Sequence, residues 1–167
     1  YSYEWEACDN QIWFEDFESY DDSNIDSQSN DWIGWDGANS GADVTDDFSN
    51  GTDAGFMSSQ SILVEQDDDL IHMLNSAPNS GSGEVIFYMY IESGDNGGYY
   101  NMLHDYDAAN SNWAFQVLFA SQNSGDQSFV DLENPIYFDA LYDTWVEVRH
   151  EINIDNDIIN LYYNSDL

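Results

Sequence analysis

With 167 residues the chain is long enough for one domain with a two-layer core, and its 42% hydrophobic and 16% aromatic content excludes a disordered acidic tail. Its 34 acidic residues face a single residue among Lys and Arg, so the formal net charge is -33. This charge excludes nucleic acid as a partner, because phosphate binding requires Lys and Arg, and no run of eighteen apolar residues is present to insert into a membrane.

Period-two alternation of apolar residues dominates the chain and predicts β-strands. In chain order the expected strands are 12–17, 61–66, 70–74, 84–92, 99–104, 113–119, 128–132, 144–152 and 158–163. Segments rich in Gly, Asn, Asp and Ser separate them, including a tight hairpin turn at 155–157. Short strands at this spacing predict an all-β fold, a two-sheet antiparallel sandwich.

The segment 144–152 has the clearest alternation. Val148 and His150 share one face of the expected strand, and Arg149 lies on the other. Glu147 and Glu151 are its neighbours on that face, so we expect a charge-assisted network around the guanidinium group.

The order of several short motifs resembles that of concanavalin A-like (LamG-like) jelly-roll domains, which occur in secreted and cell-surface proteins of Bacteroidetes-type bacteria. The motifs are FEDFESY at 14–20, SSQSI at 58–62, FYMYI at 87–91 with GGYY at 97–100, DTWVEV at 143–148 and IDNDIINLY at 154–162. The resemblance implies a jelly-roll domain over residues 14–167, preceded by an N-terminal extension over 1–13.

Two departures from the family pattern stand out. Such domains usually carry basic residues, which are nearly absent here, so we expect either a salt-adapted (halophilic) relative or a cation-dependent assembly. They also usually continue past the hairpin that ends near Tyr163 with strands that close the sandwich. Either the chain is a fragment, or a closing strand comes from another copy or a neighbouring protein.

The beginning of the chain bears on its location. No signal segment precedes Tyr1, which is typical of a processed exported protein or of a fragment, and we expect a secreted, extracellular or cell-surface location. Cys8 is the single cysteine, so an internal disulfide is excluded.

Acidic clusters are the candidate metal ligands, because Ca²⁺ prefers several oxygen ligands at once. The resemblance implies a structural Ca²⁺ near the first strand, where Glu15, Asp16 and Glu18 lie, and Asp67 and Asp69 occupy an expected turn. Ordinary solvated surface charge is the alternative for both groups.

Aromatic residues are the candidate ligand-binding groups, because flat rings pack against sugar faces. The expected platform consists of Trp32, Trp35, Tyr99, Tyr100 and Trp113, with Asn101, His104 and Gln116 as hydrogen-bonding groups. Core packing is the alternative use of these rings.

Catalytic spacing is not evident in the sequence. Glycosidases of this fold carry a Glu-x-Asp-x-x-Glu run, which is not found, and neither a Gly-x-Ser-x-Gly motif nor a zinc-protease motif occurs. We therefore expect a non-catalytic module for adhesion or for binding a glycan or surface polymer. The alternative is a structural subunit of an extracellular assembly or filament, joined by strand complementation and cation bridges.

Overall fold

The computed structural model describes residues 11–35, 41–46, 58–74 and 78–164. The chain forms two compact units, Tyr1–Asn79 and Ser80–Leu167, where the sequence predicted one domain over 14–167. In the described residues the helical elements are three-residue 3-10 turns and all longer elements are strands, so the predicted all-β class is confirmed.

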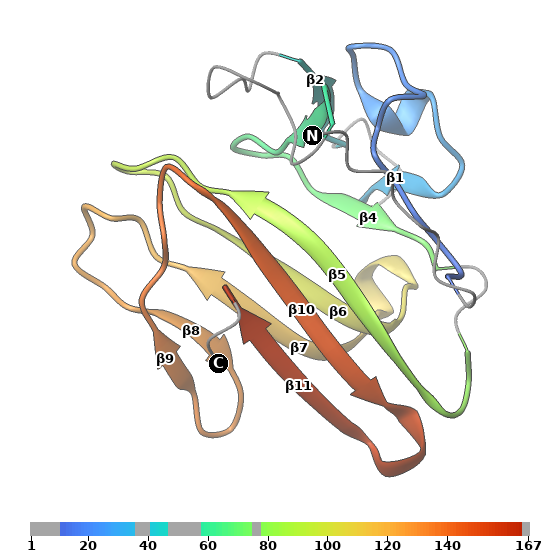
Figure 1. Cartoon of the computed structure of the whole chain (residues 1–167), viewed down its shortest axis with the longest axis vertical. Helices are drawn as coiled ribbons and strands as arrows, with labels where there is room; N and C mark the ends of the chain where they lie inside the picture. The colour runs from blue at the N-terminus through green and yellow to red at the C-terminus, as the bar shows by residue number, and fades with distance from the viewer. Residues whose placement is uncertain (1–10, 36–40, 47–57, 75–77, 165–167) are drawn as a thin grey trace, which may run out of the picture. The chain divides into compact units, whose positions relative to one another are not determined.

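The larger unit contains two antiparallel sheets. One has three strands in the order β11-β10-β5, and the other has four in the order β6-β7-β8-β9. Figure 1 shows them as two layers, with the three-stranded sheet nearer the viewer. The elements are β5 (Ser82–Tyr90), β6 (Gly98–Asp105), η3 (Ala108–Asn110), β7 (Asn112–Phe119), β8 (Ser128–Asp131), β9 (Ile136–Phe138), β10 (Trp145–Asn153), η4 (Ile154–Asn156) and β11 (Ile158–Tyr163).

One hydrophobic core joins these two sheets. Its buried members are Ile91, Phe115, Val117, Phe119, Val130, Phe138, Val146, Val148 and Tyr163. The alternation along each strand explains which residues enter the core. In β10, Val146 and Val148 are buried, whereas the alternate residues Glu147 and Arg149 are only half-buried. Burying one face of each sheet is what stabilises two such layers.

The smaller unit is built from short elements: η1 (Ile25–Ser27), β1 (Trp32–Gly34), β2 (Asp43–Thr45), β3 (Ser61–Leu63) and β4 (Leu70–His72). β1 pairs with β4 and β2 pairs with β3, both antiparallel. Its most buried side chains are Ile25, Ala42 and Val44, each 0% exposed. The Ile25 amide donates to the Ala42 carbonyl, which ties η1 to the start of β2.

Most strand predictions are confirmed, with ends displaced by one or two residues. The segments 84–92, 99–104, 113–119, 128–132, 144–152 and 158–163 correspond to β5, β6, β7, β8, β10 and β11. The hairpin at 155–157 is also confirmed, and Asp157 closes it in the left-handed region at φ 53°. The segments 61–66 and 70–74 contain strands of three residues.

The strand predicted at 12–17 is wrong. Residues 11–16 have no regular structure. The Phe17 amide donates to the Glu15 carboxylate and the Glu18 amide to the Asp16 carboxylate, so local side-chain bonds replace a strand ladder there. The three-residue strands β1, β2 and β9 were not predicted, because three residues are too few to show a period.

Candidate binding face

A row of four large side chains crosses the outer face of the four-stranded sheet. Tyr99 of β6 lies opposite Leu118 of β7, Leu118 opposite Phe129 of β8, and Phe129 opposite Tyr137 of β9. Each alternates with a residue that points into the core, so all four share the outer face. We call Tyr99, Leu118, Phe129 and Tyr137 the apolar row.

The two ends of the apolar row are open to solvent. Tyr99 is 56% exposed and Tyr137 is 59% exposed. The rings of Phe129 and Tyr137 are 5.8 Å apart between centroids and tilted by 45°, which is a normal aromatic contact. The row therefore presents ring faces and edges to solvent along a line that spans the sheet.

A polar row lies beside it, one step further along the same strands. Asn101 of β6 pairs with Gln116 of β7, and Gln116 pairs with Asp131 of β8. Side chains two residues apart on a strand share a face and are separated by about 7 Å. The Asn101 Oδ1 atom is buried and makes no hydrogen bond within the described residues. Asn101, Gln116 and Asp131 together give this strip amide and carboxylate groups.

A shallow depression of about 370 Å³ lies on the other side of the apolar row. Leu118, Phe129 and Tyr137 give it an apolar lining, and Asp126 and Gln127 from the β7–β8 connection give it a polar rim. An apolar floor with a few placed polar groups is the usual composition of a ligand site. The apolar row is thus flanked by polar groups on both sides.

A glycine shapes this end of the sheet. A Cβ atom at Gly97 would lie 2.6 Å from the Phe119 carbonyl oxygen. Only glycine permits so close an approach of the β6 entrance to the end of β7. The GGYY motif at 97–100 therefore serves the packing of this sheet, because its first glycine allows the approach that brings Tyr99 beside Leu118.

The structure brings together three of the eight predicted ligand-binding residues: Tyr99, Asn101 and Gln116. Trp113 is 50% exposed and lies where the β6–β7 register shifts, outside the two rows. His104 is exposed near the same end of β6. Leu118, Phe129 and Tyr137 were not predicted as ligand-binding residues. The alternation within 128–132 already places Phe129 and the buried Val130 on different faces of the same strand.

Tyr100 lies in the core and not on the outer face. Its hydroxyl is 3.0 Å from Nε2 of His150, which is completely buried. The rings of Phe87 and Phe115 pack around this pair. Burial lowers the pKa of His150 to about 4 and raises the pKa of Tyr100, because both charged forms lose hydration. The imidazole is therefore neutral in the native core.

Trp32 and Trp35 belong to the smaller unit. Trp32 packs with Trp13, Phe17 and His72, with the Trp32 and His72 ring centroids 4.5 Å apart. The Trp35 amide donates to the Asp69 carbonyl. Both tryptophans therefore take part in the packing or hydrogen bonding of their own unit.

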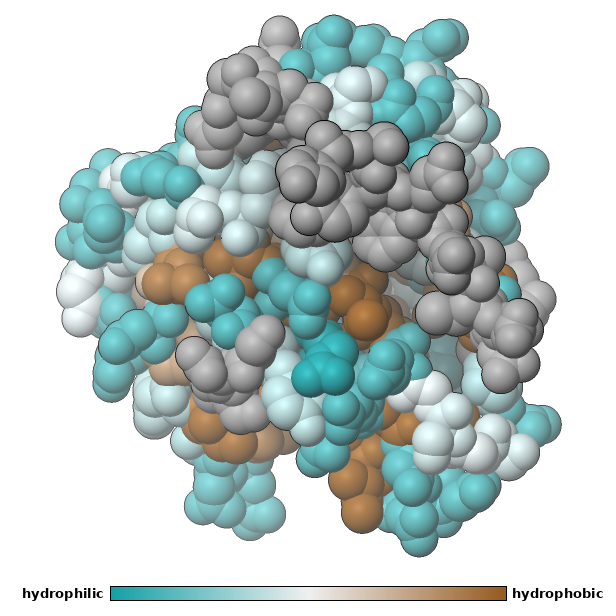
Figure 2. Space-filling view, viewed as in Figure 1, coloured by the Kyte–Doolittle hydropathy of each residue, from teal (hydrophilic) through white to brown (hydrophobic). Residues whose placement is uncertain are grey.

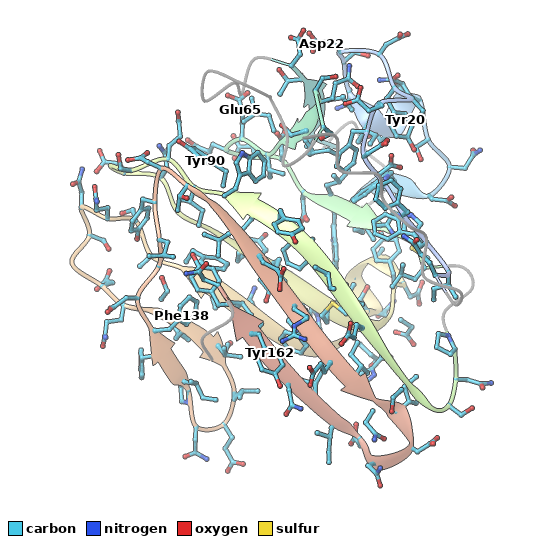
Figure 3. All side chains as sticks on the ribbon, in the orientation of Figure 1. Tyr20, Asp22, Glu65, Tyr90, Phe138 and Tyr162 are labelled. Atoms are coloured by element: carbon cyan, nitrogen blue, oxygen red, sulfur yellow. The ribbon has the colours of Figure 1, made fainter. Side chains whose placement is uncertain are left out.

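The outer face of the three-stranded sheet carries a network of charged groups in place of an apolar row. Arg149 lies within 3.1–3.9 Å of carboxylate oxygens of Glu84, Glu147 and Glu151, and its guanidinium carbon is 4.3 Å from the centre of the Tyr162 ring. The predicted network is thus present, with Glu84 and Tyr162 as additional members. The Tyr162 hydroxyl donates to Glu151, and Figure 3 shows this tyrosine projecting from β11.

The predicted metal ligands near the beginning of the described chain are engaged in loop contacts. Glu15 accepts from the Phe17 amide and, at 3.1 Å, from the Tyr20 hydroxyl. Glu18 accepts from the amides of Ser59 and Gln60 and from the Ser59 hydroxyl. Hydrogen bonding to the Ser59 hydroxyl is the main reason why the pKa of Glu18 is lowered.

The other predicted metal ligands lie in the turn between β3 and β4. Asp67 adopts a left-handed backbone at φ 74°, and the neighbouring Asp68 carboxylate accepts from the Glu65 amide. In the part of the chain that the structure describes, no three His, Cys, Asp or Glu side chains are arranged to hold a metal ion. Cys8 lies outside the described residues.

Comparison of the chain with family models, curated proteins and solved structures gives no match. Among the described residues, no helix has the length and apolar character needed to cross a membrane.

Proposed function

We propose that this protein is a non-catalytic binding module that takes a glycan on the outer face of the four-stranded sheet. The observation that carries the proposal is the apolar row, Tyr99–Leu118–Phe129–Tyr137, with polar groups on both sides. Sugars present an apolar C–H face and a rim of hydroxyl groups, and such a strip matches both features. The rings contact the face, and amide and carboxylate groups accept or donate at the rim.

The charge of the chain selects among glycans. Asp126 and Asp131 lie on either side of the apolar row, and the whole chain has a formal charge of -33. A polysaccharide rich in uronic acid or sulfate would be repelled by this field. The ligand class is therefore a neutral polysaccharide or oligosaccharide.

The finer fold assignment belongs to the same proposal. Two antiparallel sheets packed on one core are compatible with a concanavalin A-like jelly roll, and glycan binding on a sheet face agrees with the family resemblance in the sequence. Secretion and adaptation to a saline environment complete the proposed setting, since salt screens the charge that opposes folding.

The experiment is a binding screen of the full chain against immobilised neutral and anionic glycans at ~0.15 M NaCl, where the Debye length is about 8 Å. We expect binding to neutral glycans and none to uronic-acid or sulfated ones. The Tyr137→Ala and Tyr99→Ala variants should each lose about tenfold in affinity, equivalent to about 1.4 kcal/mol, because each removes an exposed ring of the row.

Trp113→Ala is the matched control, because Trp113 is also an exposed ring of the same sheet but lies outside both rows. It should bind like the parent chain. Absence of any glycan binding, or equal losses in all three variants, would contradict the proposal.

A further inference from the structure

The edge strand β11 belongs to the three-stranded sheet, whereas the proposed glycan face lies on the four-stranded sheet. β11 pairs with β10 through six consecutive residue pairs without a bulge, and in the described residues no strand pairs with its other side. It contains neither Pro nor Lys, which are the residues that commonly protect exposed edges. Figure 1 shows it at the margin of the near layer.

The direction of its backbone groups follows from one hydrogen bond. The Asn164 amide donates to the Glu147 carbonyl at 2.9 Å, so the pair 147–164 is hydrogen-bonded. Bonded and non-bonded pairs alternate in an antiparallel ladder. The bonded partners in β11 are therefore Tyr162, Asn160 and Ile158. The N–H and C=O groups of Ile159 and Leu161 point away from β10 toward the open edge, whereas Tyr163 at the end of the strand is only 6% exposed.

The side chains at this edge are incompletely covered. Ile159 pairs with Ile152 and points toward the core side, yet it is 39% exposed, while Ile158 on the outer side is 53% exposed. Ile154 in the adjoining turn is 37% exposed. Figure 2 shows hydrophobic side chains among polar ones toward the end of the face where β10 and β11 join. An added strand would cover these isoleucines as well as satisfy the backbone groups.

Charge determines which kind of strand would fit. The edge lies beside Asp155 and Asp157 of the hairpin and Glu151 of β10, and the whole chain has one basic residue among Lys and Arg. A second copy would bring another formal charge of -33 to the same place, which opposes pairing. A segment with Lys or Arg would instead be attracted.

We propose that the open edge of β11 binds an extended, basic segment of a partner protein by strand addition, with apolar residues of that segment on the isoleucines. Main-chain hydrogen bonds to Ile159 and Leu161 give the affinity, and alternate side chains give the specificity. The partner strand becomes the fourth strand of this sheet, in the order partner-β11-β10-β5.

The test uses the full chain and a fluorescent ten-residue peptide of alternating Val and Lys, measured by anisotropy at ~0.15 M NaCl. A second peptide has the same sequence but carries N-methyl groups on the amides that face β11. We expect the N-methylated peptide to bind at least tenfold more weakly, because it keeps the charge but cannot donate to the edge. Equal binding of the two peptides would overturn the proposal, since it would reduce the interaction to non-specific charge attraction.

A pair of variants locates the site. Ile159→Pro and Ile159→Ala both remove the apolar side chain, but only proline removes the N–H that points to the edge, and it spares the ladder with β10. The proline variant should lose at least tenfold more affinity than the alanine variant. If Ile159→Pro fails to fold, the comparison of peptides on the parent chain still decides the matter.

Light scattering of the chain alone tests whether a second copy of the chain, and not a basic partner segment, occupies the edge of β11. A dimer that dissociates in Ile159→Pro would overturn the proposal in favour of a second copy. Tyr137→Ala should bind the peptide like the parent, so failure of strand addition and failure of glycan binding are separate results.

Discussion

The strands of the unit Ser80–Leu167 run to nine residues, whereas none in the described part of Tyr1–Asn79 exceeds three. Long strands alternate enough apolar residues to bury a shared core, which contains Val148, Phe119 and Tyr163. In the short-stranded unit, carboxylates of Glu15 and Glu18 accept backbone N–H groups and close the loops. An acidic chain with almost no Lys or Arg thus uses its own backbone donors as partners for carboxylates.

The largest expected effect concerns the core of the larger unit. Phe119 is 4% exposed and contacts Tyr100, Phe138 and Tyr163 through its ring. Phe119→Ala should lower the free energy of unfolding by about 3–5 kcal/mol, because it leaves a cavity between the sheets. Urea denaturation followed by circular dichroism measures it.

Leu132→Ala is the control for that substitution, since Leu132 is 43% exposed just after β8. Its effect should stay below about 1 kcal/mol. Similar losses for the two variants would mean that the core is not what stabilises this unit.

The buried histidine gives a pH-dependent effect of intermediate size. The pKa of His150 is lowered from 6.5 to about 4, so the unfolded chain takes up a proton at a higher pH than the native one. Its contribution to stability is complete above pH 6.5 and decreases as the pH falls through this window, by about 3 kcal/mol at most.

His150→Gln separates this effect from the titration of the many carboxylates. We expect the difference in unfolding free energy between parent and variant to shrink as the pH falls from 7 to 4, measured by denaturation at each pH. A constant parent-to-His150→Gln difference across the range would show that burial does not lower the pKa of His150.

A smaller effect tests the loop closure of the other unit. Glu18→Gln removes a charge that accepts from Ser59 and Gln60, and we expect a loss of about 1 kcal/mol, since the site is exposed and the bonds are charge-assisted. Asp22→Asn removes one negative charge at an exposed position and should be neutral or slightly stabilising. If the two variants have the same melting temperature, the hydrogen bonds that Glu18 accepts do not stabilise the unit, and the effect of the residue is limited to its negative charge.

The smallest effect distinguishes general screening from a specific cation. We expect NaCl to raise the melting temperature gradually, because it screens a net charge of -33. CaCl₂ at equal ionic strength should act alike. A stabilisation that saturates at low Ca²⁺ and disappears in Glu15→Gln would instead establish the calcium site predicted at Glu15, Asp16 and Glu18.

The sequence was most informative where strands are long. Alternation within 144–152 correctly placed Val148 and His150 on one face and Arg149 on the other, and the structure shows that the face of Val148 and His150 is the buried one. It failed at 12–17, where the carboxylate of Glu15 competes for the backbone amides that a strand would need.

The candidate face could be predicted only in part. Tyr99 and Gln116 lie in recognisable strands, but which strands are neighbours is a long-range property that alternation does not specify. The short strand of Tyr137 gave no signal, although this residue completes the row beside Phe129. The prediction put both Tyr99 and Tyr100 on the platform. Adjacent residues of a strand point to opposite faces, so only Tyr99 lies on the outer face and Tyr100 packs against the core.

The most direct test of the central claim is calorimetric titration of the full chain with a soluble neutral oligosaccharide selected by the glycan screen. The double variant Tyr99→Ala/Tyr137→Ala removes both exposed ends of the apolar row. We expect the parent to bind, Trp113→Ala to bind equally, and the double variant to lose about a hundredfold in affinity. Unchanged binding by the double variant, with loss in Trp113→Ala, would contradict the account and place the ligand elsewhere on the molecule.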